Sequence, residues 1–296
     1  MSRAPQILPH AEAPAAPYLL ALSCPDRIGI VARVAQFLVE HGCNIVESAQ
    51  YGDPENSRFF LRTGFTPTTG RTPSELEPAF APIAAEYGMQ ARFHDMRRRT
   101  PTLLMVSRFG HCLNDLLFRW RIGALPIEIK AVVSNHADFA ELAGSHGLAF
   151  VHLPVTAATK ADQEARLAAL ADDLGVELIV LARYMQILSP EFCARRPGGI
   201  INIHHSFLPS FVGARPYHAA HRRGVKLIGA TAHYVTADLD EGPIIEQAVE
   251  RVEHNLSVGD YIAVGRDLEA LVLARAVKWH AEHRVLLNGS RTVIFH

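Results

Sequence analysis

The chain has 296 residues, of which 49% are hydrophobic and 20% charged, and its formal net charge is −1. Because a domain typically holds about 150 residues, this length predicts about two domains. The near-zero charge argues against nucleic acid as a partner. No apolar run reaches the ~18–20 residues of a membrane span, so no membrane partner is expected either. Residues 1–17 are rich in proline and alanine, lack the features of a signal peptide and are expected to form a disordered tail.

The segment from residue 18 to residue 95 predicts a small α/β domain. Residues that favour β-structure mark strands at 18–23, 44–51, 58–65 and 89–94, and apolar residues at helical spacing mark helices at 30–41 and 73–87. The resulting βαββαβ order is that of a ferredoxin-like fold. Residues 96–101 hold three consecutive arginines and are interpreted as a solvated linker.

From residue 102 to residue 296, strands and helices alternate. Strands are predicted at 102–107, 128–134, 149–153, 178–182, 200–203 and 227–235, with helices at 113–121 and 161–173. This alternation predicts a doubly wound, mainly parallel sheet with helices on both faces. Ligands of such sheets bind beyond the carboxyl ends of the strands. A long amphipathic helix at 261–282 and a hairpin that turns on Asn288-Gly289 follow.

Two polar side chains stand at the end of the predicted strand 199–203. Asn202 and His204 are two positions apart, so they project from one face near the carboxyl end of the strand. Asparagine is depleted in strands and costly to bury without hydrogen-bond partners. Taken alone, the pair is either a reaction centre or a polar network that closes the sheet.

A second polar group follows on the strand at 229–235. That strand carries Thr231 and His233 on one face and leads into a loop with Asp240 shortly before Gly242-Pro243. Aspartates before a Gly-Pro pair often serve only as turn formers. The loop alone therefore does not distinguish a functional carboxylate from a structural one.

Four motifs follow one another along the second half of the chain. They are Asn-Ile-His with Ser-x-Leu-Pro at 202–209, Gly-Ala-Arg-Pro-Tyr-His at 213–218, Gly-Ala-Thr-Ala-His-Tyr-Val at 229–235 and Leu-Asp-Glu-Gly-Pro-Ile-Ile at 239–245. Together they resemble the folate-dependent formyltransferase fold and, in finer detail, the formyltetrahydrofolate deformylase family. The resemblance implies an enzyme that hydrolyses 10-formyltetrahydrofolate, its folate substrate, to formate and tetrahydrofolate.

The resemblance also implies roles for particular residues. Asn202 and His204 would stabilise negative charge on the formyl oxygen and Asp240 would assist proton transfer, with Thr231 and His233 supporting them. The folate would lie in an apolar slot lined by Met185, Gln186, Ile187, Leu188 and Val235. Gln186 stands where many relatives carry arginine, so only its backbone is expected to contact the folate. The alternative for the apolar members of this set is ordinary core packing.

The acceptor of the formyl group is inferred from the loop after the first strand of this domain. In the ribonucleotide transformylases of the fold, a Gly/Ser-rich loop there cradles a phosphate, whereas residues 107–113 here include Arg108, Phe109 and His111. The chain also lacks the basic C-terminal domain of the tRNA enzymes, so water is the expected acceptor. A formyltransferase with a small amine acceptor and a catalytically silent amino-acid sensor are the alternatives.

No metal and no other cofactor is expected, although the chain holds 16 histidines. His204 and His205 are adjacent on a strand and point to opposite faces, so they are poorly placed to share an ion. No H-E-x-x-H pattern accompanies them. The four cysteines are scattered without paired spacing, which favours reduced thiols in a cytoplasmic protein.

The N-terminal domain resembles the ACT domain, a small amino-acid-sensing unit. The resemblance rests on Cys-Pro-Asp-Arg-Ile-Gly-Ile-Val at 24–31 and His-Gly-Cys-Asn-Ile at 41–45. In this interpretation Gly29 and Asn44 contact an amino-acid effector, because a glycine before a helix lets a carboxylate approach the helix N-terminus. The alternative is a purely structural dimerisation module, and both interpretations predict a homodimer or a homotetramer.

Overall fold

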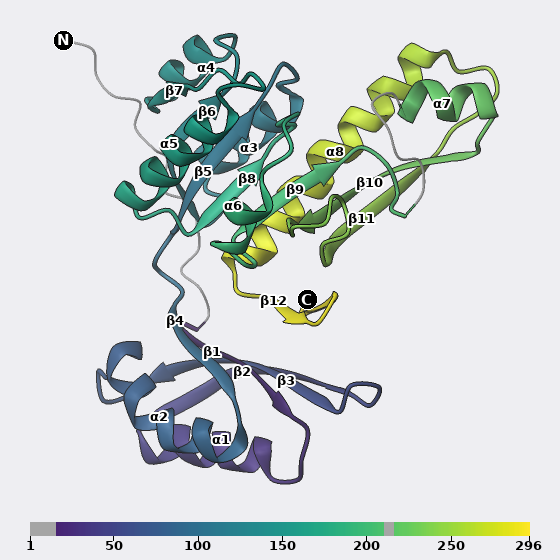
Figure 1. Cartoon of the computed structure of the whole chain (residues 1–296). Coiled ribbons are helices and arrows are strands. Elements are labelled where there is room, and N and C mark those ends of the chain that lie inside the picture. The colour runs from purple at the N-terminus through teal and green to yellow at the C-terminus, as the bar shows by residue number, and fades with distance from the viewer. Residues whose placement is uncertain (1–15, 210–215) are drawn as a thin grey trace. The chain divides into compact units, whose positions relative to one another are not determined.

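The computed structural model describes residues 16–209 and 216–296, which form two compact units (Figure 1). The N-terminal unit groups residues 16–99 with 282–288 and 292–296, and the C-terminal unit groups the described part of 100–281 with 289–291. Almost all of the predicted tail, and the residues from 210 to 215, lie outside the described ranges. Within these ranges no helix is both long and apolar enough to cross a bilayer.

The N-terminal unit has the predicted βαββαβ order. Its elements are β1 (Tyr18–Pro25), α1 (Ile30–Glu40), β2 (Cys43–Asp53), β3 (Arg58–Pro67), α2 (Pro73–Tyr87) and β4 (Gln90–Asp95). The strands form an antiparallel sheet in the order β2-β3-β1-β4. Both helices pack on one face, where the rings of Phe37 and Phe80 lie 4.9 Å apart and those of Phe80 and Phe93 5.6 Å apart. This aromatic cluster holds the helices on the sheet.

The chain ends in a hairpin of two short strands, β12 (Val285–Asn288) and β13 (Arg291–Ile294). Residues 282–288 and 292–296, which include most of this hairpin, belong to the N-terminal unit. The amide of Asn288 donates to the carboxylate of Asp53 at 2.7 Å, and the rings of His94 and His283 stack with centroids 3.6 Å apart. Two segments from opposite ends of the chain therefore build one unit.

The C-terminal unit confirms the predicted mainly parallel α/β sheet. Its elements are β5 (Thr100–Val106), α3 (His111–Arg121), β6 (Ile127–Ser134), α4 (Ala140–Ser145), β7 (Phe150–His152), α5 (Lys160–Asp173), β8 (Leu178–Leu181), α6 (Pro190–Ala194), β9 (Ile200–His204), α7 (Pro216–Arg223), β10 (Leu227–Tyr234), β11 (Ile244–Arg251) and α8 (Val258–Ala281). The strand order is β11-β10-β9-β8-β5-β6-β7. Strands β5 to β9 run parallel, and β10 and β11 run antiparallel to their neighbours.

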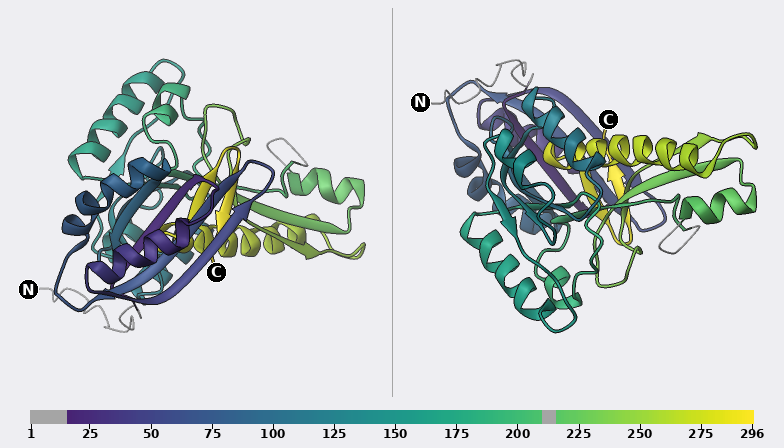
Figure 2. Two further views of the ribbon diagram at one scale, coloured as in Figure 1. Left: turned by 90° about the horizontal axis from the view of Figure 1, so that it is seen from below. Right: turned by 90° about the horizontal axis from the view of Figure 1, so that it is seen from above.

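Helices cover both faces of this sheet (Figure 2). Leu167 of α5 and Phe192 of α6 pack against Met105 and Ile179 of the central strands in one apolar cluster. The long helix α8 lies against β9, β10 and β11 and against α3. The sheet is thus buried between helical layers, and its polar residues gather where β8 and β9 end.

Two details differ from the sequence prediction. β11 was not predicted, because its residues alternate too weakly between buried and exposed positions to mark a strand. β5 starts at Thr100, inside the segment interpreted as a linker, because pairing with β6 extends the strand. Both differences arise from strand pairing, which local patterns do not encode.

Candidate active site

The register between β9 and β10 brings the predicted polar residues together. In this antiparallel pair Asn202 lies opposite His233, and His204 lies opposite Thr231. The β10–β11 register shifts between Ala232 and His233, an irregularity of the kind that re-aims a side chain. As a result the amide nitrogen of Asn202 lies 3.3 Å from Nε2 of His233.

Asp240 joins these residues from the loop between β10 and β11. Its carboxylate lies 3.2 Å from Nδ1 of His204 and 3.5 Å from Nε2 of His233. Its backbone has a φ of 58°, in the left-handed region that aspartate tolerates better than most residues. The hydrogen bond from His204 holds the pKa of the carboxyl well below its usual range, so Asp240 is ionised at neutral pH.

A glycine fixes the path of this loop. A Cβ atom at Gly242 would overlap the backbone carbonyl oxygen of Tyr234, so only glycine fits there. The next residue, Pro243, accepts a hydrogen bond from the Tyr234 N–H at 2.9 Å. The loop is therefore held against β10 just beyond Asp240.

The hydrogen bonds define which ring nitrogens of the two histidines face the site. Nδ1–H of His233 donates to the Tyr234 carbonyl at 2.9 Å, so its Nε2 accepts from one N–H of the Asn202 amide. The second N–H of Asn202 stays available to a ligand. For His204, Nδ1–H donates to Asp240, and the buried Nε2 has no hydrogen-bond partner among the described residues.

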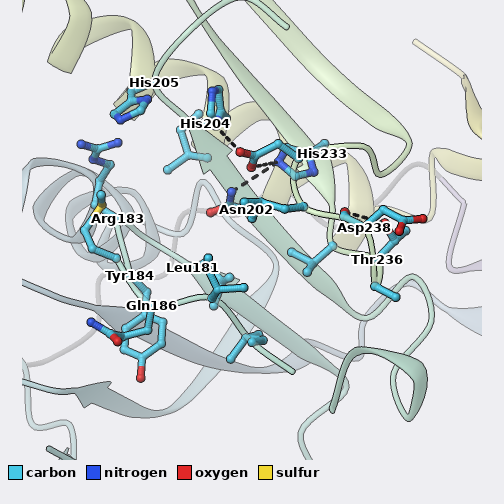
Figure 3. Close-up of a pocket in the computed structure, with 18 residues that line it drawn as sticks. Leu181, Arg183, Tyr184, Gln186, Asn202, His204, His205, His233, Thr236 and Asp238 are labelled. Carbon is cyan, nitrogen blue, oxygen red and sulfur yellow. Dashed lines mark hydrogen bonds and ion pairs between the residues drawn. The ribbon is translucent and has the colours of Figure 1, made fainter. Parts of the chain in front are cut away.

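These side chains lie in a cavity of about 320 Å³ between β8, β9 and the loop after β10 (Figure 3). The cavity brings together the catalytic candidates and every residue predicted to line a folate slot: Asn202, His204, Asp240, Met185, Gln186, Ile187, Leu188 and Val235. Met185 and Ile187 are 46% and 60% exposed, which is unusual for ordinary core and typical of a binding surface. Leu188 is buried and belongs to both the cavity wall and the apolar core.

Thr231 positions the segment that follows β9 and does not line the cavity. Its hydroxyl donates to the carbonyl of Ser206 at 2.9 Å and accepts from the N–H of Leu208 at 3.1 Å and the amide of Gln247 at 3.0 Å. Thr231 is fully buried, so these bonds have no water to replace them. They hold the chain directly after His204. Part of the predicted motif at 213–218 lies outside the described residues.

His205 and Arg183 are among the cavity residues that were not predicted from the sequence. His205 is buried, and burial, together with the charge of Arg183 and then of His204, lowers its pKa to about 4. Arg183 reaches the buried Glu269 of α8, with Nε 3.1 Å from Oε2. No local pattern signals these partners, because Arg183 and Glu269 are far apart in the sequence.

A group with metal-ligand chemistry lies beside this ion pair. His111, Cys112 and Glu269 are the one such group that the described ranges contain. That carboxylate already accepts a hydrogen bond from the hydroxyl of Tyr217 at 2.6 Å and forms an ion pair with the guanidinium of Arg183. Although burial raises the pKa of Glu269, the hydrogen bond from His111 and the charge of Arg183 outweigh it and lower the pKa.

The two predicted effector residues lie in the N-terminal unit. Gly29 precedes α1 with a φ of 96°, and no side chain caps the helix there. No acidic residue occupies its first turn. Asn44 is exposed in β2.

Comparison with known proteins agrees with both units. A profile of the formyl transferase family matches residues 102–277, and one of the ACT domain matches residues 18–74. A formyltetrahydrofolate deformylase of Corynebacterium is 49% identical, over 94% of this chain and 97% of that protein. The crystal structure of a formyltetrahydrofolate deformylase from Burkholderia mallei is 54% identical with a TM-score of 0.91, covering 94% of this chain and 99% of the other.

A transformylase structure matches less of the chain. Glycinamide ribonucleotide transformylase 1 of Symbiobacterium toebii is 32% identical with a TM-score of 0.64. The match covers 69% of this chain and 97% of the transformylase chain. The fold and the site thus define a class of proteins in which a formyl transferase domain follows an ACT domain. Within that class, the chain belongs to the formyltetrahydrofolate deformylase family.

Proposed function

We propose that Asn202, His204 and Asp240 carry out the reaction of this family in the cavity described above. The reaction is the hydrolysis of 10-formyltetrahydrofolate to formate and tetrahydrofolate. The observation that carries the assignment is the ionised Asp240, which fixes His204 beside the Asn202 amide with its Nε2 unpaired within the described part of the chain. Such an aspartate–histidine pair presents a ring nitrogen that can take up a proton and give it back.

The folate is proposed to lie with its apolar surface between Met185, Ile187 and Val235, which places the formyl group at Asn202. The second N–H of Asn202 then donates to the formyl oxygen as negative charge develops on it. Water attacks the formyl carbon, and His204 takes the proton that the water loses. The bond from the carbon to N10 breaks and this proton passes to N10, which leaves tetrahydrofolate and formic acid; the acid then loses its remaining proton to solvent and becomes formate.

Asp240 acts through His204 rather than as the proton acceptor. A carboxylate whose pKa lies well below its usual range is too weak a base to hold a proton from water. It instead keeps Nδ1–H of His204 in place and stabilises the positive charge that the ring acquires. Together these residues supply an oxyanion donor and a proton carrier, so we propose that the reaction needs no metal and no cofactor beyond its substrate.

Formate release from 10-formyltetrahydrofolate, measured without any added acceptor, tests this assignment. Asn202→Ala removes one oxyanion donor and is expected to lower kcat by about 10²–10³. Asp240→Asn keeps the left-handed backbone and removes the charge, and we expect a loss of about 10²–10⁴. Asp173→Asn, an exposed carboxylate in α5, is the matched control and should keep the wild-type rate. Wild-type rates in both site variants would show that the reaction centre lies elsewhere.

We also propose that the N-terminal unit binds an amino-acid effector. Gly29 leaves the first N–H groups of α1 without a side-chain cap, and such groups suit a carboxylate. The guanidinium of Arg27 lies 3.6 Å from the ring centroid of Tyr87, whose hydroxyl is close to Gly29. We further propose that the protein forms a homodimer or a homotetramer and that it is cytoplasmic. Free thiols at all four cysteines support the cytoplasmic location.

A further inference from the structure

Arg183 adopts a backbone conformation that arginine rarely uses. Its φ is 63°, in the left-handed region, directly after β8 ends. Its carbonyl accepts from the N–H of Ser107 at 3.2 Å, and the hydroxyl of Ser107 accepts from the N–H of Met185 at 2.9 Å. On the other side, the N–H of Ala182 donates to the carbonyl of Met105 at 2.8 Å, so both sides of Arg183 are tied to the end of β5. Strain that is kept in this way points to a use for the side chain.

The guanidinium of Arg183 is held by a buried cluster. Glu269, 1% exposed, contacts Nε of Arg183 at 3.1 Å and Nε2 of His111 at 2.9 Å. The hydroxyl of Tyr217 donates to the same carboxylate, and its ring fits only because Gly265 of α8 has no Cβ. Moving Arg183 outward would remove the guanidinium from the buried charge of Glu269 and leave it only His111 and the Tyr217 hydroxyl as partners, which is costly.

The loop after β5 closes over the same cluster. The ring of Phe109 has the guanidinium carbons of Arg183 and Arg266 at 5.7 Å and 5.8 Å from its centroid. The ring of Phe109 in this loop therefore contacts Arg183, and His111 contacts its partner Glu269. These two side chains lie where the resemblance places a flexible phosphate-binding loop in the ribonucleotide transformylases. Arg183 is thus held from two sides.

Within the cavity, Arg183 and His205 lie at one end, and the segment that follows β10 lies at the other. Figure 3 shows Arg183 beside His205 on one side, Thr236 and Asp238 on the opposite side, and Asn202 between them. A folate bound along the apolar wall leaves the Arg183 end as the side from which a nucleophile reaches a formyl group at Asn202. That end carries the positive charge of the Arg183 guanidinium, which Glu269 holds in place.

We propose that Arg183, held by Glu269, is a specificity-determining residue: it fills the place where an amine acceptor would stand and leaves room for water. An amine is larger than water and is largely protonated near neutral pH, so both its size and its charge oppose entry beside a guanidinium. The proposal rests on the reaction centre assigned to Asn202, His204 and Asp240.

Opening this end should convert hydrolysis in part into formyl transfer. Attack by an amine R–NH₂ on the same formyl carbon forms R–NH–CHO, and the proton it loses passes to N10 as the C–N10 bond breaks. Water and the amine thus compete to attack the same formyl carbon. The ratio of formylated amine to formate therefore measures how easily the amine enters the Arg183 end of the cavity. A residue that only stabilised the fold would change the total rate and leave this ratio unaltered.

The experiment uses the full chain, 10-formyltetrahydrofolate and glycinamide as the amine probe. Arg183→Gly suits the left-handed backbone and removes the side chain, and Arg183→Gly with Glu269→Gln also removes the buried charge left behind. We expect both to raise the ratio of formylglycinamide to formate at least about tenfold over the wild type. Arg183→Lys keeps a cation in place and should retain a ratio close to that of the wild type.

The double variant decides the outcome if Arg183→Gly alone does not fold, as judged by thermal melting. A wild-type ratio in a folded double variant overturns the proposal. Adding Asn202→Ala to the double variant should lower the formation of both products by about 10²–10³. If it leaves both unchanged, the reaction centre is misassigned, which is a failure distinct from that of Arg183.

Discussion

The imidazole of His205 stays neutral in the folded protein at neutral and mildly acidic pH. Burial, and then the charges of Arg183 and His204, lower its pKa from 6.5 to about 4. In the unfolded chain the same ring binds a proton as the pH falls below its ordinary value. Protonation therefore favours unfolding between these two values, and the folded state loses stability as the pH falls from 6.5 to about 4.

Replacing His205 with glutamine should remove this pH dependence. We expect the free energy of unfolding of the wild type, relative to His205→Gln, to fall by up to about 1.4 kcal/mol per pH unit below the ordinary histidine pKa. Urea denaturation at a series of pH values measures the difference. His254→Gln, at an exposed histidine, controls for the loss of an imidazole. Parallel stability curves for the wild type and His205→Gln would contradict the assignment.

At the scale of elements, the site depends on how β9, β10 and the following loop fit together. Antiparallel pairing sets His233 opposite Asn202, and the register shift at His233 turns its ring toward the cavity. The loop then returns Asp240 to both histidines. Gly242 fixes this return, because its close approach to Tyr234 excludes any side chain.

Gly242→Ala should therefore impair catalysis without touching a catalytic residue. The added methyl group overlaps the Tyr234 carbonyl, so the loop must shift and carry Asp240 away from His204. A displacement of about 1 Å in a reacting group costs roughly 10²-fold in rate, and we expect kcat to fall by about that amount. Gly144→Ala, where a Cβ meets open space in α4, is the control for a glycine replacement. Equal formate release by the two variants would contradict this role for the loop.

At the scale of the whole molecule, the candidate active site and the proposed effector residues lie in different units. The cavity and all its polar residues belong to the C-terminal unit, and Gly29 and Asn44 to the N-terminal one. The hairpin of β12 and β13 returns the end of the chain to the N-terminal unit through Asn288 and His283. The effector hypothesis therefore concerns a unit that both ends of the described chain help to build.

Equilibrium dialysis of the full chain with glycine, serine and methionine tests that hypothesis. We expect saturable binding of one of them, weakened at least about tenfold by Gly29→Val, whose branched side chain is strained at the left-handed φ and blocks the helix start. Gly70→Val, at another left-handed glycine with open space around it, controls for backbone strain. No binding of any of the three would leave a structural role for the N-terminal unit.

The sequence by itself determined the two-domain α/β architecture, the family and the neighbourhood of Asn202, His204 and Asp240. It could do so because strand periodicity and strand-end motifs are local: they place side chains on one face and at one end without knowledge of the rest of the chain. The roles of these residues, of the folate slot and of the effector residues stay predictions.

Only the tertiary structure decided which side chains meet. The bridge from Asp240 to two histidines, the neutral state of His205 and the ion pair of Arg183 with Glu269 depend on β-sheet register, loop path and burial. The same holds for the hairpin that joins the N-terminal unit. Such partners are distant in sequence and are selected by packing and desolvation across the folded chain, which local patterns do not contain.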